Sequence, residues 1–150
     1  MNGLTIEHHI LNGGTGLSSD IAQHLCTRLL PGRVAVVSKQ PTALLASTRK
    51  QWLKILRHVQ AERAGTLDSQ RIAELTHTIA RMRSLEFSAQ PPLQAVRANV
   101  SFATIEQFID VPPMCHTLYV ATPTDKDTLP ELTRFMPKHS LVVIYGVERP

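Results

Sequence analysis

Three short runs of apolar, mainly β-branched residues constrain the fold of this chain most. They lie at residues 33–38 (RVAVVS), 117–121 (TLYVA) and 140–145 (SLVVIY). None of them alternates between apolar and polar side chains, so each is typical of a strand buried on both faces, as in a parallel sheet. Segments with helical spacing separate these runs, and strands that alternate with helices predict an α/β domain.

Two further segments complete the predicted sheet, at residues 4–11 and 96–102. The chain has 150 residues, which suits one domain and is long enough to bury a core. We therefore expect a single α/β domain over residues 1–150, with a mostly parallel central sheet of about five strands. The order of the strands does not follow from these patterns.

The region 42–85 predicts a long αα-hairpin. Its first helix should follow Pro41 and end near Gly65, and its second should start near Asp68. The second helix carries an apolar stripe with helical spacing, made of Ile72, Leu75, Ile79 and Met82. In the first helix Trp52 falls on the apolar side, so we expect it to belong to the core.

Positive charge is concentrated in this predicted hairpin. Residues 42–85 hold eight Lys and Arg against three acidic residues, a local excess of five, whereas the whole chain has a net charge of +4. Such an excess is the electrostatic signature of phosphate contacts, although a solvated helix face has a similar composition. We therefore predict a non-enzymatic binding or accessory module that contacts nucleic acid or an acidic protein. The predicted contact residues are Arg49, Lys50, Lys54, Arg57, Arg63, Arg81 and Arg83.

A glycine-rich turn, NGGTGLSSD at residues 12–20, suggests an alternative function. Glycines let backbone N–H groups approach a phosphate, and the N-terminus of the following helix favours an anion. Asp20 opposes this role because it would repel a second negative charge. The alternative is a nucleotide- or phosphate-binding protein that uses Gly13, Gly14, Thr15, Gly16, Ser18 and Ser19.

The segment from Ile10 to Ser38 resembles the start of the short-chain dehydrogenases, which also run from a strand through a glycine-rich turn and a helix to a second strand. The resemblance covers about a fifth of the chain. Leu17, Ser18 and Ser19 stand where that family has its later glycines. A Tyr-x-x-x-Lys pair is also absent, because Tyr119 is followed four residues later by Pro123 and Tyr145 by Arg149.

Other chemistry-bearing residues predict no catalytic group, metal site or cofactor. His8 and His9 are adjacent and should point to opposite faces of a strand, and the other five histidines are scattered along the chain. Cys26 and Cys115 form no metal-binding pair; two buried free thiols are expected, and a single disulfide between them is the alternative that stays open at this point. Residues beyond the carboxyl end of the strand at 117–121 suit either ligand binding or helix capping, namely Thr122, Thr124, Asp125 and Asp127.

The chain holds no apolar run long enough for a membrane span, and its first ten residues lack the pattern of a signal peptide. We therefore expect a cytoplasmic protein without membrane contact. A third functional interpretation, a structural subunit of a larger assembly, stays open at this point.

Overall fold

The computed structural model describes residues 3–11, 16–28, 32–89, 99–110, 114–122 and 127–147. Within them the protein is an α/β domain with one six-stranded, all-parallel sheet and five helices. The strands are β1 (Thr5–Leu11), β2 (Val34–Val37), β3 (Phe87–Ser88), β4 (Val100–Ala103), β5 (Thr117–Val120) and β6 (Leu141–Val147). The helices are α1 (Leu17–Thr27), α2 (Pro41–Gly65), α3 (Ser69–Arg83), α4 (Ile105–Asp110) and α5 (Thr128–Thr133).

The strand order across the sheet is β1-β6-β5-β2-β4-β3, and every neighbouring pair is parallel. The prediction of about five strands is therefore wrong by one. The missed strand, β3, has only two residues, and Phe87 pairs with Val100 of β4. A segment this short has no periodicity that a sequence pattern can reveal.

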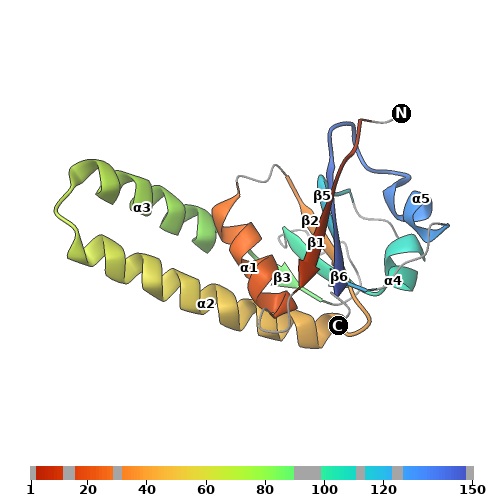
Figure 1. Ribbon diagram of the computed structural model, residues 1–150, viewed down its shortest axis with the longest axis horizontal. Helices are drawn as coiled ribbons and strands as arrows, with labels where there is room; N and C mark the ends of the chain where they lie inside the picture. The colour runs from red at the N-terminus through yellow and green to blue at the C-terminus, as the bar shows by residue number, and fades with distance from the viewer. Residues whose placement is uncertain are drawn as a thin grey trace.

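Helices cover both faces of the sheet (Figure 1): α1 and the start of α2 lie on one face, α4 and α5 lie on the other, and α3 packs against α1 and α2. This arrangement follows from the path of the chain. From β1 the chain moves across the sheet to β2 and then β3, and from β4 it returns to β5 and β6. Because parallel crossovers are right-handed, opposite directions of travel place the connecting helices on opposite faces.

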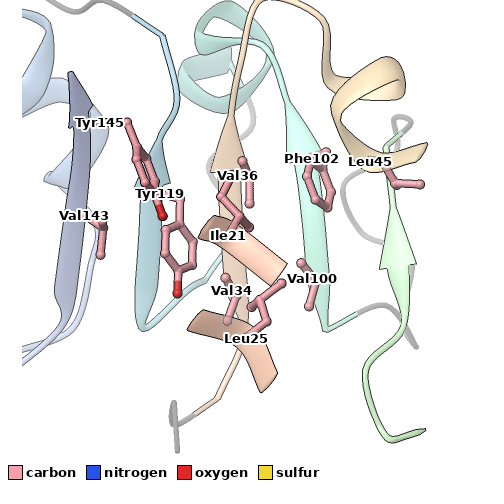
Figure 2. Packing of buried hydrophobic residues seen from close by; sticks show 10 residues of the cluster. All are labelled: Ile21, Leu25, Val34, Val36, Leu45, Val100, Phe102, Tyr119, Val143 and Tyr145. Atoms are coloured by element: carbon pink, nitrogen blue, oxygen red, sulfur yellow. The ribbon is translucent and has the colours of Figure 1, made fainter. Parts of the chain in front are cut away.

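The core has one apolar layer on each face of the sheet. Figure 2 shows the first layer, where Ile21 and Leu25 of α1 lie against strand residues that include Val36 and Phe102. On the other face Phe108 of α4 and Leu132 of α5 pack in a cluster with alternate residues of β2, β5 and β6. All residues of β2 and of β5 are buried, which confirms that these runs form strands covered on both sides.

Helices α2 and α3 pack against each other and extend beyond the edge of the sheet (Figure 1). Their contact with α1 is apolar, through a cluster that contains Cys26, Leu56, Ile79 and Met82. Trp52 is half-buried beside this cluster, and its indole Nε1 donates a hydrogen bond to the carbonyl of Met82 at 3.2 Å. At the start of α3 the side chain of Asp68 caps the helix by accepting from the backbone N–H of Gln70.

The two cysteines are buried and free, as the sequence predicted. Cys26 lies in the cluster between α1, α2 and α3, whereas Cys115 lies in the layer on the opposite face of the sheet. Burial raises the pKa of each thiol to about 12. Among the described residues, no helix combines the length and the apolar character needed to cross a bilayer.

Candidate functional sites

The glycine-rich turn falls mostly outside the described residues: Gly13, Gly14 and Thr15 are not among them. Gly16 is the N-cap residue of α1, with an extended backbone that any residue adopts, and a Cβ at this position would meet no atom within 4 Å. Ser18 and Ser19 are half-buried in the first turn of α1, and the N-cap makes no side-chain hydrogen bond. Because α1 starts at Leu17, Ser18, Ser19 and Asp20 all lie inside the helix and none of them is its N-cap residue.

Three of the predicted contact residues share one face of α2. Lys50, Lys54 and Arg57 have exposed side chains at relative positions i, i+4 and i+7, on the side of the helix away from buried Leu45 and Leu56. Within the described ranges none of the three has a carboxylate partner. We call these three residues the α2 basic face.

The other four predicted contact residues lie in different surroundings. The guanidinium of Arg49 lies 5.8 Å from the ring centre of Phe87, while Arg63 and Arg83 are exposed in the last turns of their helices. Arg81 is half-buried and lines a cavity of about 210 Å³, together with Leu25, Gly32, Val34, Ser84, Leu85 and Asn99.

A second group of polar residues, which the sequence analysis missed, lies between β1 and α1. We call it the α1–β1 cluster: Glu7, His9, Asp20, His24 and Arg28. Arg28 donates two hydrogen bonds to the Glu7 carboxylate, at 2.9 Å and 2.8 Å. Glu7 Oε1 is 3.1 Å from His9 Nε2, and His9 Nδ1 is 3.3 Å from Asp20 Oδ2. His9 therefore lies between two carboxylates.

His24 completes the cluster from the next turn of α1. Its ring centre is 4.5 Å from that of His9, and its buried Nδ1 has no hydrogen-bond partner in the part of the chain that the structure describes. Tyr145 contacts His9 edge-on at 5.5 Å, and Tyr119 contacts His24 at 5.9 Å. Figure 2 shows that both tyrosines project from neighbouring strands on the sheet face that α1 covers.

The surroundings set the protonation of this cluster. The hydrogen bonds from Arg28 lower the pKa of Glu7 to about 2, so this carboxylate is ionised at neutral pH. Burial lowers the pKa of His24, which favours the neutral imidazole. Burial also raises the pKa of Tyr145, which keeps the phenol protonated. The cluster thus combines an anion and a neutral imidazole, and the uncharged hydroxyl of Tyr145 lies beside it.

Two spacings in the sequence could have revealed this cluster. Glu7 and His9 are two residues apart, which places them on one face of a strand. Asp20 and His24 are four residues apart, which places them on one face of a helix. When each histidine is considered alone, its distance along the sequence from the other histidines is not one that is typical of metal ligands. The signal becomes visible only when the strand and the helix that follows it are considered as a packed pair.

A cleft of about 380 Å³ lies at the carboxyl ends of β2, β4 and β5, lined by Ser38, Lys39, Thr104, Ile105, Glu106 and Thr122. Of the four residues expected beyond the strand at 117–121, Thr122 lines this cleft. Thr124 and Asp125 are outside the described residues, and Asp127 precedes α5 without a side-chain cap. Thr104 and Gln107 form a capping box at the start of α4, each side chain accepting from the other's backbone N–H.

No protein-family model matches this chain, and no curated protein is significantly similar to it.

Proposed function

We propose that this protein is a nucleic-acid-binding accessory module that contacts the phosphate backbone through the α2 basic face. The observation that carries the proposal is the row of three exposed cations on a helix that extends beyond the sheet (Figure 1). A projecting helix can approach a long polyanion without steric conflict with the rest of the domain. Each cation that neutralises a phosphate releases condensed counterions, which favours binding at low salt.

The charge balance of α2 supports this proposal. The helix holds five Lys and Arg but a single acidic residue, Glu62. Glu62 accepts from Arg71 of α3 at 2.8 Å, so this carboxylate is directed toward α3. The field of the α2 basic face is therefore not offset by a neighbouring carboxylate on the same helix.

Base stacking contributes little to the proposed contact. Single-strand binders place aromatic side chains in a basic groove. Trp52 instead donates to the Met82 carbonyl of α3, and its ring centre lies 5.9 Å from that of Phe87 in β3. We therefore expect binding that depends on phosphate charge and is weakly selective for base sequence.

The test compares a charge-reversal triple variant, K50E/K54E/R57E, with wild type in binding to a labelled generic DNA duplex at low salt. Three exposed cations elsewhere on the domain give a matched control with the same change in net charge, R33E/R134E/K138E. We expect the first variant to lose at least tenfold in affinity and the control to lose much less. Equal losses would indicate only a net-charge effect. Retained affinity for DNA in the first variant would contradict the proposal.

An acidic protein surface is the competing partner for the same face. Parallel titrations of the protein with a DNA duplex and with an acidic peptide of equal charge distinguish a nucleic-acid partner from a protein partner. Tighter binding of the peptide, with the same dependence on Lys50, Lys54 and Arg57, would favour a protein partner.

A second candidate function is the binding of a small phosphorylated ligand in the cleft at the carboxyl ends of the strands. The observation that favours this function is the position of the cleft. β2 leads to α2 on one face of the sheet, while β4 and β5 lead to helices on the other face. Ligands of open α/β sheets bind at such switch points. Lys39 supplies a cation there and Glu106 opposes an anion. Micromolar ATP or NAD binding that Lys39→Ala abolishes would support this function, and its absence would exclude it for these ligands.

A further inference from the structure

We propose that His9, Asp20 and His24 form a binding site for a divalent first-row transition metal ion, with Zn²⁺ as the ion of best fit. Each residue offers one ligand atom, and the three atoms lie within 4.8 Å of one another. Imidazole nitrogen and carboxylate oxygen are the donor types that suit zinc and its neighbours in the first transition row.

The spacing between the first two donors suits a metal better than a direct contact. Two ligands that are each about 2.0–2.1 Å from a tetrahedral Zn²⁺ are about 3.3 Å apart. His9 Nδ1 and Asp20 Oδ2 are 3.3 Å apart. A charge-assisted hydrogen bond between such groups is shorter, about 2.7–2.9 Å. The pair is thus held at the separation that two zinc ligands adopt.

The neighbours of His9 set it up as a ligand. His9 Nε2 faces Glu7 Oε1 and Nδ1 faces Asp20 Oδ2, so the tautomer that is protonated at Nε2 would donate to Glu7 and present its Nδ1 lone pair to a metal ion beside Asp20. Arg28 fixes Glu7 in turn through its two hydrogen bonds. A carboxylate that accepts from the non-ligating nitrogen is the usual outer-shell partner of a zinc-bound histidine, because it orients the ring and raises its basicity.

His24 supplies an independent observation. Its Nδ1 is buried and without a hydrogen-bond partner in the described part of the chain. Leaving a buried polar atom unsatisfied is costly, and such atoms in native proteins call for a specific explanation. A metal ion between the α1–β1 residues would satisfy a ring nitrogen of His24.

The scaffold around the three ligands is regular. His9 lies in the middle of β1 and pairs with Tyr145 of β6. Asp20 and His24 come from successive turns of α1. Ligands on helices and strands are held more precisely than ligands on loops. Three protein ligands leave one tetrahedral position for water, which is the arrangement of an open zinc site.

The experiment titrates metal-free protein with Co²⁺, followed by Zn²⁺. We expect one equivalent of Co²⁺ to bind with the intense visible absorption of a tetrahedral ion, and Zn²⁺ to displace it. Asp20→Asn and His24→Gln should each weaken binding at least tenfold. Glu7→Gln should weaken it about 10- to 100-fold, as loss of an outer-shell partner does. His8→Gln and His58→Gln, at exposed histidines outside the cluster, are the controls and should bind like wild type.

Thermal unfolding gives a second measurement that does not depend on the variants. A metal that binds only the folded state raises the unfolding midpoint of the wild-type protein. Circular dichroism checks that each variant is folded. If one variant does not fold, the proposal is tested by the remaining variants and by the unfolding midpoint of the wild-type protein. The proposal is overturned if Zn²⁺ leaves the wild-type midpoint unchanged, or if the control substitutions weaken binding as much as those in the cluster.

Discussion

Arg71 of α3 forms an ion pair with Glu62 of α2, at 2.8 Å, and a second with Glu74 of its own helix, at 3.2 Å. Arg71 is one of the eight Lys and Arg of residues 42–85, yet its guanidinium already pairs with two carboxylates. The same contact removes Glu62 from the charge balance of α2. Among the basic residues of residues 42–85, Arg71 is therefore a weaker candidate for a partner contact than the three residues of the α2 basic face, which have no carboxylate partner within the described ranges.

Replacing Glu62 by Gln should change the free energy of unfolding little and should raise the affinity for DNA measurably. Both partners of the pair are substantially exposed, with 46% and 40% of their side-chain surface accessible, and exposed ion pairs contribute about 0–1 kcal/mol. We expect the free energy of unfolding to fall by less than about 1 kcal/mol. DNA affinity at low salt should rise, because Arg71 is released and one negative charge is lost. Urea denaturation and DNA titration measure the two effects, and a fall in affinity would contradict the charge argument.

Trp52 should stabilise the contact between α2 and α3 by packing and by one hydrogen bond. Trp52→Phe keeps an aromatic ring but removes the bond to the Met82 carbonyl, which should cost about 0.5–1.5 kcal/mol. Trp52→Ala removes the ring as well and should cost about 3–5 kcal/mol. Equal destabilisation by both substitutions would show that the ring contributes nothing beyond the bond.

Gly32→Ala should destabilise the domain because Gly32 has a left-handed backbone conformation, with φ of 65°, and a Cβ there would overlap the His116 ring. A non-glycine residue in this conformation costs about 1–3 kcal/mol. Gly65→Ala is the matched control, since it lies at the end of α2 with open space around its Cβ position. The control should be neutral or stabilising. Similar unfolding curves for the two variants would refute this account of Gly32.

Neither cysteine should react with a water-soluble disulfide reagent in the folded protein. Burial raises the pKa of both thiols to about 12, so the reactive thiolate is scarce at every pH well below that value. We expect slow labelling at pH 8 and rapid labelling of two thiols after denaturation. Rapid reaction of one thiol in the native protein would show that its site opens locally.

More of the sheet than of the candidate sites could be predicted from the sequence. The strands β2, β5 and β6 were predictable because burial on both faces requires unbroken apolar runs. β3 was not, because its two residues form a strand only through pairing with β4. Strand order is also a long-range property, since β1 and β6 come from opposite ends of the chain and pair along seven residues.

The same difference between local and long-range features explains which candidate site could be predicted from the sequence. The α2 basic face was predictable because Lys50, Lys54 and Arg57 lie on one helix, where spacing alone determines the face. The α1–β1 cluster was not, because it depends on how Asp20 and His24 pack over His9. A helix face and a strand face can each be read from their periods, but their contact requires the folded structure.

The most direct test of the central claim is the salt dependence of DNA binding by wild type and by the neutralised variant K50Q/K54Q/R57Q. The logarithm of the binding constant falls linearly with the logarithm of salt concentration, with a slope of about −0.9 for each neutralised phosphate on duplex DNA. If the three residues each contact a phosphate, the variant should have a slope shallower by about 2.7. An unchanged slope, with the variant still folded, would show that nucleic acid does not bind through the α2 basic face.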